Sequence, residues 1–256
     1  MQIAHWLSAT FLTLALGACS ESATLSVDQG SGPQPTLPPP QHRLIPTIKI
    51  ATATGWPAGV TPVAASGLTV NAFAANLDHP RWIYVLPNGD VLVAESNAPP
   101  KPDDGKGIKG AVMKSAMKRA GAAVASANRI TLLRDGDGDG VAETRTVFLA
   151  DLNSPFGMAL VGNTFYVANT DAIVRVPYRE GMTHIDAIPE KVADLPAGTI
   201  NHHWTKNVIA NSAGNLLYVT VGSNSNVGEN GMDKEENRAA ILEVDPATGK
   251  SRLYAS

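Results

Sequence analysis

The sequence predicts an all-β protein, a β-propeller of which about three blades are present, with one short helical insertion. The main observation is a repeated hairpin. Residues 79–96, 154–170 and 202–223 each place two short β-rich runs on either side of a polar turn. A further β-rich run precedes and follows each hairpin, and a repeated unit of four strands is typical of propeller blades. A stacked sandwich is the alternative, but the repeated hairpin with its outer strand disfavours it.

The turns and flanking runs fix the order of the predicted strands. Asn88-Gly89 in the first hairpin favours positive φ at both turn positions, the geometry of a tight hairpin. The preceding runs are LTVNAFA, RTVFLA and EKVADL, and the following runs are NRITLLRD, AIVRVPY and AAILEVDP. If each blade begins with the run that precedes its hairpin, a choice that we call the phase of the blades, residues 251–256 are expected to open a fourth blade. Because propellers close with about four to eight blades, the chain is expected to be the N-terminal part of a longer protein.

The N-terminal sequence predicts export and attachment to a lipid. An apolar run at residues 6–18 is too short to span a bilayer comfortably and ends in Leu-Gly-Ala before Cys19, which resembles a bacterial lipobox. The alternative is an ordinary secretory signal with a chance cysteine. We expect a lipoprotein signal peptide over residues 1–19 and lipidation at Cys19. Ser20 after the cysteine implies the periplasmic face of the envelope, at the outer membrane.

Two further segments follow the signal peptide. Residues 20–44 are rich in Pro, Ser and Gly and predict a disordered tether, because such a segment cannot bury enough apolar surface to fold. The partial propeller is expected over residues 45–256.

Composition excludes several classes of function. Twenty basic residues stand against 23 acidic ones, and the net charge of −3 leaves no excess of positive charge for nucleic acid. Cys19 is the only cysteine, so an intrachain disulfide, a cysteine-based zinc cage and an iron–sulfur cluster are excluded. Any contact with a membrane is expected through the lipid anchor only.

An insertion at residues 105–127 interrupts the first unit. Apolar residues recur there at helical spacing, with basic residues between them. A basic amphipathic helix could lie on anionic lipid or on a partner. The alternative is a helix that caps the propeller with its charges in water, and the short apolar stripe favours that alternative.

A run of alternating aspartates predicts a calcium loop. Asp135, Asp137 and Asp139 precede Gly140 and Glu143, which matches the first half of an EF-hand loop. Alternating carboxylates converge on one hard cation, and the glycine at the sixth position permits the sharp turn. Position twelve is a threonine, so the sequence predicts a single structural Ca²⁺ loop between strands. An acidic β-turn is the alternative.

The segment Asn201–Asn207 holds two adjacent histidines, His202 and His203, at the start of a predicted strand. Adjacent residues on an extended chain point to opposite sides, so a metal pair is not expected. A single histidine at a strand end is well suited to act as a general base.

Two long segments carry a family resemblance. They are NHHWTKNVIANSAGNLLYVTVGSNSNVGENG and ANRITLLRDGDGDGVAETRTVFLADLNSPFGMALVGNTFYVANTDAIVRVPY. Together they resemble the sorbosone dehydrogenase family of bacterial proteins, which is similar to soluble glucose dehydrogenases and pyranose dehydrogenases that use pyrroloquinoline quinone (PQQ). The resemblance covers about residues 66–256.

This resemblance implies a six-bladed propeller that holds PQQ on one face beside calcium. It implies that His202 takes the proton from the anomeric hydroxyl of a sugar while hydride passes to the quinone. Lys206 keeps the spacing of four residues between base and basic residue that the glucose enzymes show. His203 is the alternate base if the register slips by one.

The resemblance also implies contacts to cofactor or substrate. Arg81 would pair with a PQQ carboxylate, although a surface arginine is an equal alternative. Asn224 and Asn226 follow a blade strand, where polar groups would meet the cofactor or the sugar. The family's later arginines would fall after residue 256, so this segment alone is expected to be inactive.

Two functions therefore remain open from the sequence. The first is a quinoprotein oxidoreductase, in which PQQ oxidises an aldose or an aldehyde such as sorbosone and passes electrons to a downstream acceptor. The second is a non-catalytic propeller lipoprotein that binds a ligand or a partner protein. The fold alone does not decide between them.

Overall fold

The computed structural model describes residues 25–37, 51–57, 59–100, 107–122 and 124–256. The chain divides into two compact units, Met1–Ala51 and Thr52–Ser256. The predicted signal peptide and Cys19 lie outside the described residues. Within the described part of the chain, no helix is long and apolar enough to cross a membrane.

The first unit contains a short helix in the segment predicted as a tether. Helix α2 comprises Val27–Gly30, and its N-cap is Ser26. The side chain of Ser26 accepts a hydrogen bond from the backbone N–H of Gln29, while the side chain of Gln29 accepts one from the backbone N–H of Ser26. This reciprocal capping stabilises a single helical turn whose residues are all exposed.

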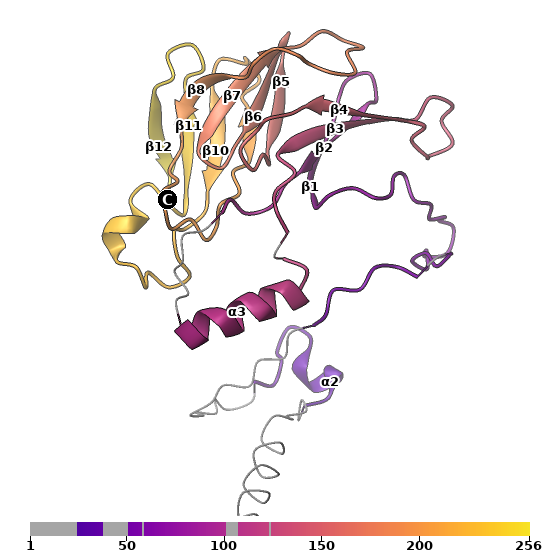
Figure 1. The fold of residues 1–256 in the computed structure, drawn as a ribbon, viewed down its shortest axis with the longest axis vertical. Helices are drawn as coiled ribbons and strands as arrows, with labels where there is room; N and C mark the ends of the chain where they lie inside the picture. The colour runs from indigo at the N-terminus through magenta and orange to yellow at the C-terminus, as the bar shows by residue number, and fades with distance from the viewer. Residues whose placement is uncertain (1–24, 38–50, 58, 101–106, 123) are drawn as a thin grey trace, which may run out of the picture. The chain divides into compact units, whose positions relative to one another are not determined.

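The second unit forms three four-stranded antiparallel sheets, which are three propeller blades (Figure 1). The structure confirms the predicted all-β fold class. Blade one comprises β1 (Pro80–Val85), β2 (Val91–Glu95), β3 (Arg129–Arg134) and β4 (Thr144–Leu149); blade two comprises β5 (Met158–Val161), β6 (Thr164–Ala168), β7 (Ala172–Pro177) and β8 (Glu190–Asp194); blade three comprises β9 (Val208–Ala210), β10 (Leu217–Val221), β11 (Ala240–Val244) and β12 (Ser251–Ala255). In each sheet the strands follow one another in chain order.

The predicted phase of the blades was wrong by one strand. Residues 68–74 contain no strand, and Ser251–Ala255 does not open a fourth blade but pairs with β11 as the outer strand of blade three. The run RTVFLA likewise belongs to β4, the outer strand of blade one. The β-rich runs have similar composition, so their spacing fits either phase.

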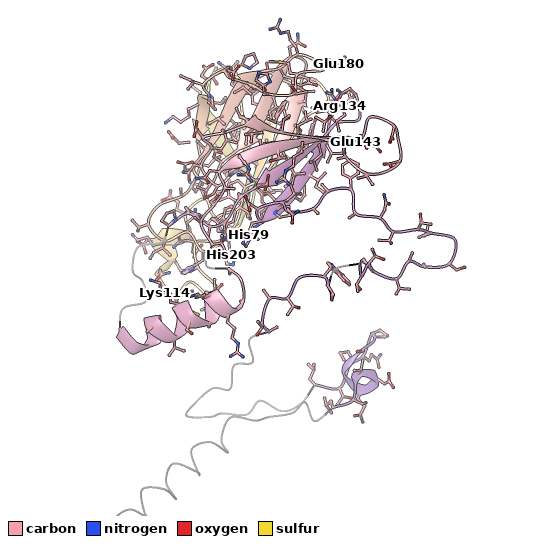
Figure 2. All side chains as sticks on the ribbon, turned by 45° about the vertical axis from the view of Figure 1, so that its right-hand side comes forward. His79, Lys114, Arg134, Glu143, Glu180 and His203 are labelled. Atoms are coloured by element: carbon pink, nitrogen blue, oxygen red, sulfur yellow. The ribbon has the colours of Figure 1, made fainter. Side chains whose placement is uncertain are left out.

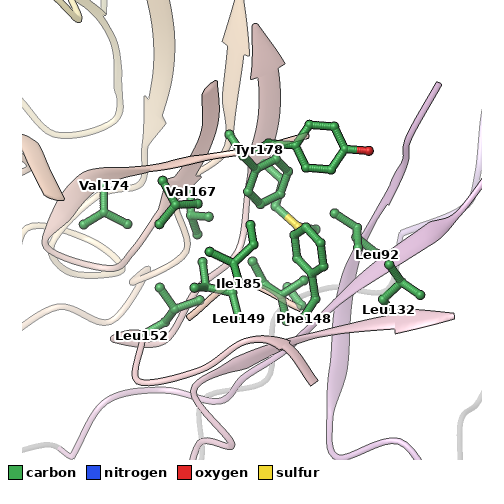
Figure 3. Close-up of a cluster of buried hydrophobic side chains, with 14 of the residues drawn as sticks. Leu92, Leu132, Phe148, Leu149, Leu152, Val167, Val174, Tyr178 and Ile185 are labelled. Carbon is green, nitrogen blue, oxygen red and sulfur yellow. The ribbon is translucent and has the colours of Figure 1, made fainter. Parts of the chain in front are cut away.

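The hydrophobic core lies between neighbouring blades. Between blades one and two, Phe148 packs edge-on against Phe165 with their ring centroids 5.6 Å apart. Figure 3 shows this cluster, with Leu92 and Leu132 of blade one and Val167 of blade two around the aromatic rings. A second cluster joins blades two and three around Val219 and other apolar residues of β6, β10 and β11. Blade two therefore buries one face of its sheet against blade one and the other face against blade three.

The predicted helical insertion is confirmed as α3 (Gly107–Arg119). The helix ends in two basic residues, Lys118 and Arg119. Its apolar side chains Val112, Met113 and Met117 are exposed. The expected packing of this stripe against the propeller is therefore not seen at these three residues.

Gly157 lies in close contact with the chain that leads into blade three. Its N–H donates to the carbonyl oxygen of Lys206 at 3.0 Å, and its carbonyl oxygen accepts from the N–H of Ala168 at 2.8 Å. A Cβ atom at this position would lie 2.5 Å from the backbone nitrogen of Val208 and 2.6 Å from Cα of Asn207. Only glycine leaves room for this contact.

We predict that Gly157→Ala destabilises the protein by about 1–3 kcal/mol, because the added methyl group overlaps backbone atoms that cannot move independently. The measurement is urea-induced unfolding followed by tryptophan fluorescence. Gly55→Ala is the matched control, since a Cβ atom there meets nothing within 4 Å. Equal unfolding midpoints for the two variants would contradict the close contact.

Candidate functional site

Polar residues follow the second strand of every hairpin. Ser96-Asn97 follow β2, Asn169-Thr170 follow β6, and Asn224-Ser225 come after β10, and all six residues are buried. Hydrogen bonds join these strand ends across blades. The hydroxyl of Ser96 donates to the carbonyl oxygen of Pro155 at 2.6 Å, and the hydroxyl of Thr170 donates to that of Trp204 at 3.0 Å. We call this region of the propeller the polar end.

Arg81 connects blade one to blade three at the polar end. Its guanidinium carbon lies 5.4 Å from the centroid of the buried Trp204 ring. Its Nε donates to the carbonyl oxygen of Ser96 at 3.3 Å, and its Nη2 donates to Oδ1 of Asn97 at 3.1 Å. Arg81 therefore belongs to the polar end, although the residue as a whole is exposed.

Lys206 is fully buried behind Trp204. Its Nζ donates to the carbonyl oxygen of Trp204 at 3.3 Å. Burial, together with the positive charge of Arg238, lowers the pKa of Lys206 from 10.5 to about 8, while the negative charge of Asp171 opposes this effect. Among the described residues, no carboxylate lies within ion-pair distance of Lys206.

Arg238 is a second buried cation at the polar end, and the sequence analysis missed it. Its Nη1 donates to Oδ1 of Asn201 at 2.6 Å, and its Nη2 donates to the carbonyl oxygen of Ala197. Burial lowers the pKa of Arg238, and Glu235 opposes this effect. The only sequence signal is an arginine directly before the apolar run of β11, which is too common a pattern to indicate a site.

The two histidines lie in different surroundings, as their adjacent positions predict. His202 is half-buried, and its backbone N–H donates to the carbonyl oxygen of Asn224 at 3.1 Å. His203 is exposed, and its Nδ1 lies 3.1 Å from the carbonyl oxygen and 2.8 Å from the hydroxyl of Ser223. Gly222 permits this contact, because a Cβ atom there would lie 2.5 Å from Cβ of His203. Figure 2 shows His203 and His79 at the same end of the sheets.

The two asparagines that were predicted to meet the cofactor or the sugar, Asn224 and Asn226, differ in burial. Asn224 is buried, its backbone N–H donates to Oε2 of Glu235 at 2.6 Å, and its Nδ2 has no hydrogen-bond partner within the described part of the chain. Asn226 is exposed on the following loop, where its N–H donates to Glu229 at 3.3 Å. Asn224 therefore contributes an unpaired donor to the polar end.

The predicted calcium loop connects β3 to β4. One oxygen from each of Asp135, Asp137, Asp139 and Glu143 lies within 4.8 Å of the others. Gly140, at the sixth position, has a φ of 85°, and its N–H donates to Asp135 at 2.8 Å. This hydrogen bond is the main cause of the lowered pKa of Asp135. The described geometry therefore brings together the four residues that the spacing indicated.

This acidic loop lies at the opposite end of blade one from the polar end. Strand β3 runs antiparallel to β2, with Glu95 opposite Arg129 and Val91 opposite Leu133. The end of β3 therefore lies beside the first hairpin turn, where Arg134 forms an ion pair with Asp90 at 2.6 Å. Figure 2 shows Arg134 and Glu143 away from His203. A cation in this loop would stabilise a turn and would not contact a ligand at the polar end.

Comparison with known proteins places the chain in a family. A model of a domain of unknown function (DUF7133) matches residues 64–256. The chain belongs to this family. No curated protein matches the DUF7133 chain.

Solved structures share the fold of the DUF7133 chain. A Trichoderma reesei protein of Carbohydrate-Active Enzymes Family AA12 is 20% identical with a TM-score of 0.50, and the match covers 73% of this chain and 41% of that one. The pyranose dehydrogenase PQQ domain from Coprinopsis cinerea is 17% identical with a TM-score of 0.49, and the match covers 71% and 39%. The DUF7133 chain thus spans less than half the length of these neighbours. At this identity, the AA12 likeness shows the propeller fold alone.

We predict that Asp137→Ala combined with Asp139→Ala abolishes stabilisation by calcium. An ion that binds only the folded state raises the melting temperature by mass action. Differential scanning fluorimetry with and without CaCl₂ measures the shift. The double variant Glu180→Ala/Asp186→Ala removes the same charge from exposed positions outside the loop and should keep the parent's response. Equal calcium shifts in the loop variant and the parent would show that the loop is only an acidic turn.

We also predict that Lys206→Met stabilises the protein at pH 7 by roughly 1–3 kcal/mol. The folded-state pKa of about 8 lies below the ordinary value of 10.5. The unfolded state therefore binds more protons between these pH values, and the parent gains stability as pH rises through this window. The advantage of Lys206→Met should accordingly disappear by about pH 10.5, as measured by urea unfolding at several pH values.

Lys191→Met is the control for this pH dependence, because Lys191 is exposed and its pKa is raised by Asp194. The control should show no stabilisation at pH 7. A constant difference between Lys206→Met and the parent across the whole pH range would mean that the buried amine is not charged at neutral pH.

Proposed function

We propose that this chain is part of a PQQ-dependent dehydrogenase that oxidises an aldose or an aldehyde such as sorbosone. The proposal rests on one observation above all: the ring of His203 is held by Ser223 at the same end of the blades as the buried Lys206 and Arg238. The neighbouring structures support this class, since they include a pyranose dehydrogenase PQQ domain and a PQQ-bound aldose sugar dehydrogenase.

The donors at the polar end fit PQQ chemically. PQQ is a planar quinone with several carboxylates, so its periphery consists mostly of hydrogen-bond acceptors. The polar end offers donors: the exposed guanidinium of Arg81, the two buried cations and the unpaired Nδ2 of Asn224. Arg81 and Asn224 would hold the cofactor, as the sequence resemblance implied, and Asn226 lies at the exposed rim.

Bound PQQ would supply the hydride acceptor, and the chain itself would supply the base. In the tautomer in which Nδ1 of His203 carries the proton and donates to Ser223, Nε2 would carry the lone pair that receives a proton from the substrate. The exposure of His203 allows a sugar hydroxyl to reach that atom. The family spacing instead favours His202, whose backbone is anchored to Asn224. The two histidines are therefore tested together.

The remaining parts of the proposal concern the whole protein. Ca²⁺ in the β3–β4 loop would have a structural role. Lipidation at Cys19 would hold the protein on the periplasmic face of the outer membrane, and a downstream acceptor would receive the electrons. Because the chain spans less than half of its neighbours' length, we propose the activity for the complete protein.

We predict that replacing the base by alanine lowers turnover about 10²–10⁴-fold while PQQ remains bound, because a general base acts on the transition state. Dye-linked oxidation of aldoses and sorbosone, with PQQ and calcium added, compares His202→Ala with His203→Ala. Ser223→Ala removes the hydroxyl that contacts Nδ1 of His203 and keeps the backbone carbonyl that also contacts it. This variant should lower turnover only if His203 is the base. Normal turnover in both histidine variants, or no PQQ-dependent turnover in the parent, would replace the enzyme by the non-catalytic binding propeller.

A further inference from the structure

Helix α3 presents apolar side chains to solvent over most of its length. Residues 111–115 and 117–120 are all exposed, and Ala116 between them is half-buried. Val112, Met113 and Met117 are 64%, 53% and 44% exposed. A surface helix normally buries its apolar side chains, and a short helix without such packing is marginal in water. The blades do not cover these side chains, which are left for another surface.

The backbone at the end of α3 is nevertheless fixed. The N–H of Ala122 donates to the carbonyl oxygen of Met117 at 2.9 Å, and Gly121 before it has a φ of 72°, which is the usual glycine cap of a helix. Nδ2 of the buried Asn97 then donates to the carbonyl oxygens of Ala122 at 3.3 Å and Val124 at 2.7 Å. Asn97 belongs to the polar end, so these hydrogen bonds attach α3 there. Figure 2 shows Lys114 of the helix at the same end of the molecule as His203.

Two stripes of side chains adjoin each other on the helix. Met113 and Met117 lie one turn apart, and so do Lys114 and Lys118. Residues four positions apart share a face of a helix, and each lysine follows a methionine directly in the sequence. All four side chains are exposed. The helix therefore presents an apolar stripe with a basic stripe beside it.

The charge of α3 is opposite to that of the rest of the chain. The helix contains four basic residues (Lys109, Lys114, Lys118 and Arg119) and no acidic residue. The whole chain has 20 basic and 23 acidic residues, so the remainder has 16 basic residues against 23 acidic ones. Positive charge is thus concentrated on one exposed helix of an acidic protein, where it attracts an anionic surface.

An anionic lipid surface satisfies both stripes at once. Apolar side chains of an interfacial helix enter the boundary between headgroups and acyl chains, while lysine side chains reach the phosphates. Nucleic acid would neutralise the lysines but offers no apolar phase for the methionines. Lipidation at Cys19, as proposed above, would keep a bilayer close to the chain. A second, weak contact with that bilayer then gains from the high local concentration.

We propose that α3 docks onto an anionic phospholipid surface, with Met113 and Met117 at the acyl boundary and Lys114 and Lys118 at the phosphates. This contact would add to the lipid anchor, which the sequence predicted as the sole membrane contact. Because Asn97 ties the end of α3 to the polar end, the bilayer would lie beside that end. The docking surface lies outside the proposed active site and is independent of the reaction.

The test is co-sedimentation of the full chain with lipid vesicles. Cys19→Ser removes the lipid anchor, and vesicles of phosphatidylcholine alone are compared with vesicles that also contain phosphatidylglycerol. The protein should bind the anionic vesicles more tightly, and NaCl should release it, because salt screens exposed charges. Residues 1–24 contain no lysine or arginine, so they cannot supply this preference. Equal binding to the two kinds of vesicle, or no binding to either, would overturn the proposal.

The basic stripe is tested in the same Cys19→Ser chain. Lys114→Gln combined with Lys118→Gln should weaken binding to the anionic vesicles about tenfold or more, because each basic residue near such a surface strengthens binding about fivefold. Lys191→Gln combined with Lys250→Gln is the matched control, since it removes two exposed lysines elsewhere. The control should bind as the parent does. Unchanged binding in the α3 variant, or an equal loss in the control, would overturn the proposal.

The apolar stripe distinguishes a bilayer from an acidic polypeptide. Met113→Gln combined with Met117→Gln keeps the charge of α3 and should also weaken binding to the anionic vesicles. All the substituted side chains of α3 are exposed, and thermal melting checks that each variant is folded. Binding that needs the two lysines but not the two methionines would indicate a purely electrostatic surface for an acidic polypeptide, and would overturn the lipid assignment.

Discussion

The carbonyl oxygen of Trp204 accepts hydrogen bonds from the hydroxyl of Thr170 and from the amine of Lys206, while the indole ring lies beneath Arg81. These contacts bring all three blades to one residue. Thr170 belongs to the strand end of blade two, Arg81 to the first strand of blade one, and Trp204 to the approach to blade three. The position of the histidine pair depends on this junction, since His202 and His203 directly precede Trp204.

The same junction contains the buried side chain of Lys206. Its amine keeps one hydrogen bond, but burial still lowers its pKa to about 8. A well-packed apolar side chain would serve stability better, because a buried charge that lacks a partner opposes folding. Lys206 and Arg238 therefore oppose folding where they are buried, at one end of the blades. Functional sites are where perturbed pKa values and unsatisfied polar atoms gather.

The acidic loop and the polar end are separate features of blade one. Antiparallel pairing of β2 and β3 places the loop beside the first hairpin turn and the polar residues at the other end of the strands. A cation in the loop would neutralise four converging carboxylates and thereby hold the β3–β4 turn. Its effect is therefore expected on the stability of blade one, at the end away from His203.

The sequence by itself determined those features that depend on neighbours along the chain. The hairpins follow from polar turns between β-rich runs, α3 from helical spacing, and the acidic quartet from alternate aspartates and Glu143. The sequence did not determine the phase of the blades, because a β-rich run such as residues 251–256 has no local signal for the strand with which it pairs. Arg238 and Thr170 join through Asn201 across 68 residues of sequence, and Arg81 reaches Trp204 across a blade boundary. Only the tertiary structure brought these groups together and left two buried cations without a carboxylate, since burial and pairing depend on long-range packing that residue types alone do not encode.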